Sequence, residues 1–415
     1  MSPVPWIRIA CLAAGVVVHA NDWPEFRGPT RQGHAAVKTA PLHWSATSNV
    51  VWSVPISGSG WSSPSLYRGR LYVTTAARTG EGPNALRVIC LDAGDGRELW
   101  NTQVFEQAAA TPGIHAKNGH ASPTPLVEGD HLFVHFGHEG TARLGLDGKV
   151  QWRQTALRYT PVHGNGGSPA RVDDLLVFSA DGADDPVVVG LDAATGAMRW
   201  KTPRAIEVKR HFSFCTPLVI EVKGKRQVVL PGSGAVCAYD PKDGREIWRA
   251  RYGEGYSVVP RPVYANGLLY IGTGYDRPWI HAVRPDGTGD VTDTHVAWKL
   301  AKGAPNTPSM LAVGDALYAV SDAGIASCID GMTGEVRWSE RLGGDFSSSP
   351  VYAAGRLYFQ NEAGVGFVVQ PGNTFRLLAK NDLGERTLAS YAVDEGTFYI
   401  RTASRLFKIG METTR

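Results

Sequence analysis

The stretch that decides the fold of this chain is Leu91-Asp92-Ala93-Gly94-Asp95-Gly96, which is followed by Trp100. Its aspartate stands eight residues before its tryptophan, and three further stretches keep this spacing: Leu191-Asp192-Ala193-Ala194-Thr195-Gly196 before Trp200, Tyr239-Asp240-Pro241-Lys242-Asp243-Gly244 before Trp248, and Ile329-Asp330-Gly331-Met332-Thr333-Gly334 before Trp338. An aspartate can accept hydrogen bonds from turn amides, and a glycine tolerates positive φ. We therefore predict a hairpin at each stretch, whose second strand carries the tryptophan into an interface.

Tryptophans recur along the chain at intervals of 40 to 52 residues. Four strands of about 5–6 residues and their turns occupy a unit of that length. The series consists of Trp52, Trp100, Trp152, Trp200, Trp248, Trp298 and Trp338. A repeat of this period predicts an all-β protein, a β-propeller whose four-stranded antiparallel blades pack on their neighbours.

A second phrase opens most units and ends in proline. Its copies are Ser63-Pro64, Thr124-Pro125, Ser168-Pro169, Thr216-Pro217, Arg261-Pro262, Thr307-Pro308 and Ser349-Pro350. Proline cannot donate to a sheet ladder, so it belongs at the start of a strand, here the innermost strand of a blade at the central channel. We interpret the serines as part of this strand start, because no Gly-x-Ser-x-Gly elbow marks any of them as a nucleophile.

The two ends of the chain set the number of blades. Leu377 takes the place of a tryptophan in the seventh unit, and the last stretch, 389–409, supplies only three strands. The segment Asn49-Val50-Val51-Trp52 matches Glu335-Val336-Arg337-Trp338, so it can supply the missing outer strand. Closing the ring in this way removes exposed sheet edges, and it predicts eight blades.

The chain divides into three segments. Residues 1–20 contain Arg8 followed by an apolar run and a small-residue site at Ala20, so they predict a cleavable signal peptide and a periplasmic or secreted protein. Residues 21–40 lie outside the repeat and predict an arm that docks its aromatic side chains on the ring. Residues 41–415 form the propeller. No later segment is long and apolar enough to predict a membrane span.

Charge and cysteine usage restrict the classes of function. The net charge of +3 falls to +2 without the leader, which predicts no nucleic-acid partner. Cys90, Cys237 and Cys328 stand in matching strands two or three residues before an aspartate. That regularity favours buried apolar side chains over a disulfide framework.

These phrases resemble the pyrroloquinoline-quinone-like (PQQ-like) propeller repeat, marked by an Ala/Leu-x-Asp, Thr-Gly, Trp pattern, over about nine-tenths of the mature chain. The opening 22–33 and the stretch Gly58-Ser59-Gly60-Trp61-Ser62-Ser63-Pro64 look like a branch of exported repeat proteins of environmental bacteria. The resemblance implies three kinds of function: quinone-dependent dehydrogenases, a scaffold lipoprotein of the outer-membrane β-barrel assembly machinery, and sensor or carbohydrate-binding modules. A shared fold does not choose among them.

The resemblance to the dehydrogenases implies a quinone on the propeller axis, with a calcium ion held by Glu and Asn, a catalytic Asp and often an adjacent-cysteine disulfide. This sequence has no Cys-Cys pair, no Cys-x-x-Cys-His haem phrase and fewer residues than those enzymes. It also has no convincing lipidated cysteine of the scaffold lipoprotein. We therefore predict no cofactor for the leading function.

Candidate ligand-binding residues lie just ahead of the innermost strands, where a propeller opens its channel. They are Trp61, His120, His163, Asn165, His211, Phe212, Ser213, Tyr256, Ser257, Lys302, Asp345 and Arg386. Trp61 and Phe212 could stack on a sugar or quinone ring. The competing interpretation is that channel rims are polar because water fills them, and that Trp61 packs under a loop.

Metal sites are weaker predictions. His120, His163 and His211 lie on successive units, but their separation argues against one shared metal ion, so we predict none. Two acidic groups could hold calcium, although solvated turns explain them better: Asp181, Asp184 and Asp185, and Asp286, Asp290 and Asp293.

The sequence favours a non-enzymatic exported propeller that offers a binding or scaffold surface to a protein or carbohydrate of the cell envelope. The alternative is a PQQ-dependent oxidoreductase of the alcohol or sugar dehydrogenase kind. In that alternative the quinone, with calcium, would lie at the channel mouth.

Overall fold

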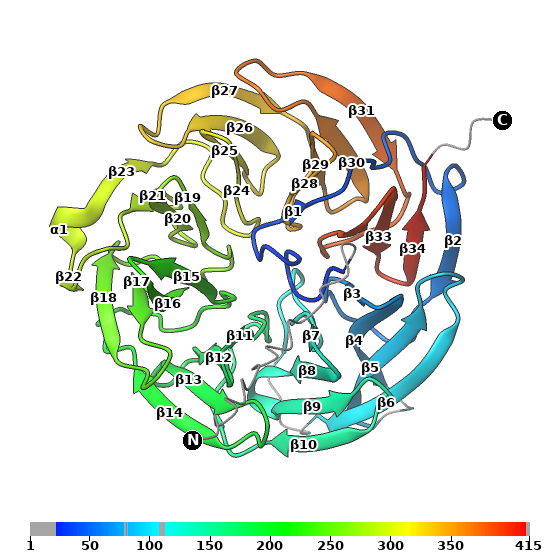
Figure 1. The fold of residues 1–415 in the computed structure, drawn as a ribbon, viewed down its shortest axis with the longest axis horizontal. Helices are drawn as coiled ribbons and strands as arrows, with labels where there is room; N and C mark the ends of the chain where they lie inside the picture. Colours follow the sequence, from blue (N-terminus) through cyan, green and yellow to red (C-terminus); the bar gives the residue numbers. More distant parts are fainter. Residues whose placement is uncertain (1–21, 79, 81, 108–112, 412–415) are drawn as a thin grey trace, which may run out of the picture.

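The computed structural model describes residues 22–78, 80, 82–107 and 113–411, which form a ring of eight β-sheets around a central axis (Figure 1). The predicted signal peptide lies outside the described residues. Each sheet is a blade whose strands run antiparallel from the axis outward. The prediction of an eight-bladed propeller is confirmed. In the part of the chain that the structure describes, no helix is long and apolar enough to cross a bilayer.

Blades 1 to 4 follow one another along the chain. Blade 1 contains β3 (Ser65–Tyr67), β4 (Arg70–Arg78), β5 (Asn84–Asp92) and β6 (Glu98–Glu106). Blade 2 contains β7 (Leu126–Glu128), β8 (His131–His135), the 3₁₀ turn η1 (Gly137–Glu139), β9 (Thr141–Gly145) and β10 (Val150–Gln154). Blade 3 contains β11 (Ala170–Val172), β12 (Leu175–Ala180), β13 (Val187–Asp192) and β14 (Met198–Pro203). Blade 4 contains β15 (Leu218–Val222), β16 (Lys225–Pro231), β17 (Ala235–Tyr239) and β18 (Glu246–Arg251).

Blades 5 to 8 complete the ring. Blade 5 contains β19 (Val263–Ala265), β20 (Leu268–Gly272), β21 (Ile280–Val283) and β23 (Val296–Leu300). Blade 6 contains β24 (Leu311–Val313), β25 (Ala316–Val320), β26 (Ile325–Asp330) and β27 (Val336–Arg341). Blade 7 contains β28 (Val351–Ala353), β29 (Arg356–Gln360), β30 (Val365–Val369) and β31 (Leu377–Asp382). Blade 8 contains β32 (Ala392–Asp394), β33 (Thr397–Arg401), β34 (Arg405–Ile409) and β2 (Val50–Pro55).

The ring closes through blade 8, where strands from both ends of the chain share one sheet. β2 pairs antiparallel with β34, with Trp52 opposite Lys408 and Pro55 opposite Arg405. The blue and red strands therefore lie side by side in Figure 1. This pairing confirms the predicted closure, and it completes blade 8 as a four-stranded sheet in which β34 is not left as an unpaired outer strand.

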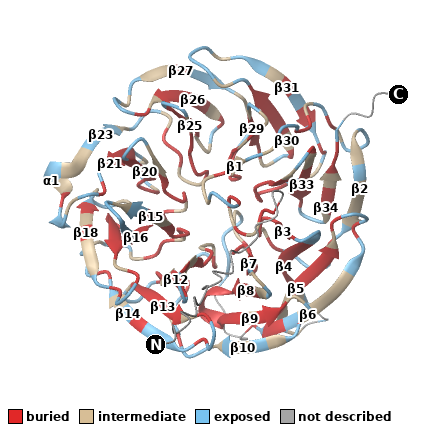
Figure 2. Ribbon diagram, in the orientation of Figure 1, coloured by how far each residue is buried: buried red, intermediate tan, exposed pale blue. Residues whose placement is uncertain are grey.

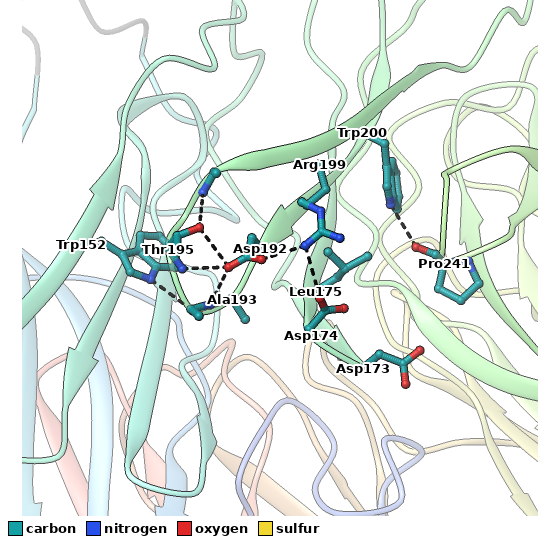
Figure 3. A network of polar contacts seen from close by, with 12 residues as sticks. Trp152, Asp173, Asp174, Leu175, Asp192, Ala193, Thr195, Arg199, Trp200 and Pro241 are labelled. Atoms are coloured by element: carbon teal, nitrogen blue, oxygen red, sulfur yellow. Dashed lines mark hydrogen bonds and ion pairs between the residues drawn. The ribbon is translucent and has the colours of Figure 1, made fainter.

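The repeated hairpin works as a contact between neighbouring blades. In blade 3, Asp192 Oδ1 accepts hydrogen bonds from the amides of Ala194 and Thr195 at 3.0 and 2.9 Å, which shapes the turn (Figure 3). The Trp152 indole of blade 2 donates to the Ala193 carbonyl at 3.1 Å. It lies so close to Gly196 (φ +75°) that a Cβ there would meet the ring at 2.7 Å. Glycine is thus required by both its φ and its neighbour.

The same indole-to-carbonyl bond recurs around the ring at 2.9–3.3 Å, from Trp52, Trp100, Trp200, Trp298 and Trp338. Trp248 is the exception, because its indole donates to Gln227 Oε1 within its own blade at 2.8 Å. The neighbouring turn of blade 5 is replaced by an insertion with β22 (Gly289–Asp290) and the short helix α1 (Thr292–His295). β22 pairs parallel with β18 and covers Trp248, which is fully buried.

The apolar core runs between the blades as a chain of clusters, and exposed residues gather on the outer strands and the connecting loops (Figure 2). Cys90, Cys215, Cys237 and Cys328 are free and buried in it. Burial raises the pKa of Cys90 to about 12 and that of Cys237 to about 11, so both thiols stay protonated and act as apolar packing groups.

Residues 22–35 cross the centre of the ring as an arm (Figure 1). Trp23 is 1% exposed and forms an antiparallel bridge with Leu66 of β3. Farther along the arm, β1 (His34–Ala35) pairs parallel with β28 of blade 7. The arm therefore connects the inner strands of distant blades across the axis.

Candidate functional site

A ring of side-chain hydroxyls surrounds the axis at the start of the innermost strands. Its members are Ser63, Thr124, Ser168, Thr216, Ser309, Ser349 and Ser390, one from each of seven blades. In most of the ring, the backbone N–H at one ring position donates to the hydroxyl of the next blade at 2.8–3.1 Å, and Ser390 N–H returns to Ser63. Arg261 holds the eighth position and donates its backbone N–H to Ser309 at 3.0 Å.

This ring gives the Ser/Thr-Pro phrases a second meaning. The hydroxyl tethers its blade to the neighbour, because it accepts the backbone N–H of the ring residue in the adjacent blade. In blade 6 the sequence analysis placed this position at Thr307-Pro308, which is wrong by two residues. There Ser309-Met310 stands before β24, and Thr307 Oγ1 instead donates to Asp322 at 2.7 Å.

The arm lies one layer along the channel from the hydroxyl ring. It contacts Leu66, Val127 and Tyr352, each three residues after a ring position, through hydrogen bonds of 2.8–2.9 Å to Trp23, Pro24 and Gly33. Phe26 faces the axis and closes this end of the cavity. The channel is therefore a blind pocket that opens toward the loops ahead of the inner strands.

The loop between β6 and β7 forms part of the other wall. Its Lys117 pairs with Glu362 of blade 7 at 2.8 Å. The Ala116 carbonyl accepts a hydrogen bond from Arg386 at 2.9 Å. On the other side, the His115 amide donates to the His163 carbonyl at 3.2 Å, and the two imidazoles lie 5.4 Å apart. The loop thus reaches from blades 1 and 2 to blade 7 over the pocket.

Aromatic side chains complete the walls. His163, Phe212, Tyr256 and Tyr275 form a continuous series with ring centroids 5.2–6.4 Å apart. Across the cavity, Trp61 is half-buried and carries the Arg386 guanidinium 5.5 Å from its ring centre. The enclosed volume is about 370 Å³, within the usual range for small-molecule sites.

Four of the predicted ligand-binding residues line this pocket: Trp61, His163, Tyr256 and Ser257. Two others support it from behind or from the rim. Phe212 is buried and packs edge-to-face on His163 and Tyr256, and Arg386 covers Trp61. Ligand binding by these residues stays a prediction.

The other predicted residues lie elsewhere. His120 is bonded to Gln107 through Nδ1 at 2.6 Å, whereas Asn165 and Ser213 line a separate cavity of about 20 Å³. Half-buried His211 and exposed Lys302 and Asp345 are not among the residues that line the pocket. Counting back from the proline selected these residues wrongly, because the loops ahead of the inner strands differ in length and path.

Four of the six carboxylates considered for calcium are engaged in other contacts. Asp181 is buried with Arg204 at 2.8 Å, and Asp184 accepts hydrogen bonds from the Thr160 amide and hydroxyl. Asp286 pairs with Lys223, and Asp290 pairs with Arg251. Within residues 22–411, apart from the few that are not described, no group of three His, Cys, Asp or Glu side chains is arranged to hold a metal ion.

Several pocket residues were missed by the sequence analysis: the hydroxyl ring itself, Phe26 of the arm, and His115, Lys117 and Asn118 of the β6–β7 loop. The ring had a signal, because one hydroxyl residue precedes the proline in most units. The arm and the loop had none, since their place over the axis depends on contacts with blades far away in the sequence.

Behind the pocket, His135 at the end of β8 is 3% exposed. Its Nδ1 lies 2.8 Å from Thr141 Oγ1, and its ring lies 4.4 Å from the Phe178 ring. Burial, with a smaller contribution from His138, lowers the pKa of His135 to about 3. An unfolded histidine titrates near about 6.5, so the folded state binds the proton more weakly.

We expect this difference to make acid destabilise the protein between about pH 6.5 and 3. His135 contributes a slope of about 1.4 kcal/mol per pH unit in that window, because the unfolded chain takes up a proton that the folded chain does not. His135→Gln should therefore unfold less steeply with acid than the parent chain. The measurement is the free energy of unfolding at pH 7.5, 6, 5 and 4; parallel curves for the two proteins would contradict the assignment.

The fold and its blind axial pocket define an eight-bladed propeller of PQQ-like repeats. The family model described as outer membrane protein assembly factor BamB matches residues 43–206, 184–315 and 280–409. These matches cover most of the chain, and the chain belongs to this family.

Similar proteins fall into two functional groups. The chain is 26% identical over 308 residues to the quinohemoprotein alcohol dehydrogenase ADH IIB of Pseudomonas putida, which covers 68% of this chain and only 39% of the enzyme. The crystal structure of BamB from Moraxella catarrhalis matches with a TM-score of 0.60 at 14% identity, covering 88% of this chain and 98% of that one. Quinohemoprotein alcohol dehydrogenase from Comamonas testosteroni matches with 0.66 at 11% identity, covering 94% and 80%. Both structural likenesses show the fold alone.

Proposed function

We propose that this chain is a non-enzymatic envelope propeller whose axial pocket binds the ring of a carbohydrate. The observation that carries this proposal is the composition of the pocket. Hydroxyls of seven blades stand opposite aromatic faces, with Trp61 on one side and Tyr256 and Tyr275 on the other. Sugars present hydroxyls around apolar ring faces, so they can use both surfaces at once.

We also propose that the outside of the propeller ring acts as a scaffold for a protein partner. The family match and the likeness to the Moraxella catarrhalis protein support a role in the cell envelope, as does the predicted leader. Exposed residues gather on the outer strands and loops of the ring (Figure 2), where a protein partner could dock.

Trp61→Ala is the sharpest single test of the pocket. Trp61 is half-buried and lines the cavity, so removing it takes away one stacking face without opening the core. We expect sugar affinity to fall by about tenfold or more, which corresponds to about 1.4 kcal/mol. Calorimetric titration of sugars identified on a glycan array measures this change. Trp279→Ala is the matched control, because Trp279 is exposed and is not among the residues lining this pocket.

A quinone-dependent oxidoreductase is the second candidate, favoured by the similarity to ADH IIB over 68% of this chain. The residues present do not fit the calcium ion of that chemistry. Calcium takes six to eight oxygen ligands, usually from carboxylates. The described residues that line the pocket offer hydroxyls and the Asn118 amide but no Asp or Glu.

The two candidates separate in one experiment. The purified protein is titrated with pyrroloquinoline quinone and calcium, and dye reduction is followed with alcohols and sugars. Saturable quinone binding with substrate-dependent reduction would replace the carbohydrate proposal. Sugar binding that is lost in Trp61→Ala, without dye reduction, would support it.

A further inference from the structure

The hydroxyl ring is a set of donors as much as a set of acceptors. A serine or threonine hydroxyl carries one proton and two lone pairs. Backbone N–H groups already occupy one lone pair on Thr124, Ser168, Ser390 and others of the ring, and such a bond polarises the hydroxyl toward donation. None of the hydrogen bonds between described residues uses the protons of these ring hydroxyls. Up to seven O–H donors are therefore available to one ligand.

Three fully buried arginines, Arg27, Arg261 and Arg401, lie behind the residues that line the pocket and are not among them. Arg261 occupies the eighth ring position and shares Glu25 with Arg31. Arg27 follows Phe26 in the arm, and Arg401 lies behind Trp61 and donates to Ser62 Oγ at 2.6 Å. Among the described residues, no carboxylate forms an ion pair with Arg27 or Arg401. A buried charge without a partner is costly, so an anion nearby would be favoured.

Arg27 in particular has unused donors. It is 1% exposed, and only its Nη2 is bonded, to the carbonyls of Gln32 and Met310 at 2.6 Å. Its buried Nε and Nη1 have no hydrogen-bond partner among the described residues. Burial, and then the charge of Arg261, lower the pKa of Arg27 to about 9, and burial lowers that of Arg401 to about 9. For both side chains the main cause is burial, which disfavours the charged form, and only Arg27 has a further contribution from a neighbouring positive charge.

The other wall adds the ammonium group of Lys117, and the described residues that line the pocket include no Asp or Glu. Lys117 pairs with Glu362 at 2.8 Å, and Glu362 also accepts a hydrogen bond from the Ser347 hydroxyl. The described residues that line the pocket thus offer many N–H and O–H donors but no carboxylate as an acceptor.

We propose that the axial pocket is selective for an acidic sugar, a uronic-acid unit whose carboxylate is directed toward the hydroxyl ring and the arm and whose ring lies along Trp61. This inference rests on the proposed carbohydrate-binding function and narrows its ligand. The carboxylate supplies the acceptor that the ring donors and the buried guanidiniums require. Its charge is balanced by Arg27 and Arg401 through the low-dielectric floor.

The test compares three ligands that share one pyranose ring and differ in the group at C5, on the intact protein: D-glucuronate, its neutral methyl ester and D-glucose, each titrated by calorimetry. We expect glucuronate to bind at least tenfold more tightly than the other two. Equal affinities for all three would overturn the acidic-sugar inference while leaving the proposed function in place. If the intact protein bound no sugar, acidic or neutral, both would fail. Binding of pyrroloquinoline quinone in place of every sugar acid would also overturn the inference.

Variants of the ring locate the effect. Thr124→Val and Thr216→Val each remove one hydroxyl at nearly constant volume, and we expect each to reduce glucuronate affinity severalfold and by a larger factor than it reduces glucose affinity. Thr124→Ser restores the hydroxyl and should keep the affinity. Unchanged glucuronate binding in a folded Thr124→Val, Thr216→Val double variant would overturn the placement of the carboxylate. If that variant does not fold, the comparison of glucuronate with its methyl ester on the parent protein still decides the inference.

Discussion

Arg204→Met is expected to destabilise the folded protein by about 3–5 kcal/mol, because it leaves the buried Asp181 carboxylate without its ion-pair partner. Arg204 follows β14 and is 1% exposed. Its Nε donates to Asp181 at 2.8 Å, and its Nη1 donates to the Leu230 carbonyl of blade 4 at 3.1 Å. The side chain therefore joins two blades and neutralises Asp181. Chemical denaturation followed by tryptophan fluorescence measures the loss.

Arg199→Met is the matched control, since Arg199 lies in β14, the strand that Arg204 follows. Its guanidinium pairs with Asp192 and Asp174 at 2.9 and 3.3 Å but is half exposed (Figure 3). An exposed ion pair contributes about 0–1 kcal/mol, so this variant should stay near the parent. The double variant Asp181→Leu, Arg204→Met should recover much of the stability, because an apolar pair of suitable volume can replace a buried ion pair. Equal losses for Arg204→Met and Arg199→Met would refute the prediction.

Trp23→Ala should cost a similar amount, about 3–5 kcal/mol, because it leaves a large cavity where the arm docks. Trp23 is 1% exposed, exchanges two backbone hydrogen bonds with Leu66 and packs against Gly28, where a Cβ would meet its ring at 2.5 Å. Loosening the arm also moves Phe26, so the variant should weaken sugar binding as well as stability. Unfolding midpoints and calorimetry on one sample test both effects.

A second tryptophan calibrates this experiment. Trp279 is 39% exposed on the loop between β20 and β21, and its replacement by alanine should cost less than about 1 kcal/mol. If Trp23→Ala lowered the free energy of unfolding as little as Trp279→Ala, the arm would contribute little to the stability of the propeller. A large loss of stability with unchanged sugar binding would mean that the arm stabilises the fold but is not needed for sugar binding.

Much of the fold could be predicted because the same local sequence pattern recurs in most of the blades. The Asp-to-Trp spacing predicted the hairpins and the interface, and the structure adds the reason: the indole of one blade needs the Gly of the next, as with Trp152 and Gly196. The closure by Trp52 followed from counting strands. Blade 6 shows the limit of this reasoning, since Thr307-Pro308 imitates the ring phrase two residues early.

The candidate site was predicted only in part. Trp61, His163, Tyr256 and Ser257 lie at the pocket because they stand close to ring positions along the chain. His120, His211, Lys302 and Asp345 were chosen by the same rule but lie elsewhere. Loop length and direction, which local sequence does not encode, separate the two groups.

Sequence alone determined the architecture of this protein, because blades interact through turn and strand residues at short and regular separations. Tertiary structure alone decided which side chains surround the axial pocket. Phe26 and Arg27 reach it by crossing a closed ring, and Lys117 reaches Glu362 from another blade. Such contacts join residues as far apart as Arg27 and Met310, 283 positions along the chain, and no local pattern records which distant groups a closed ring brings together.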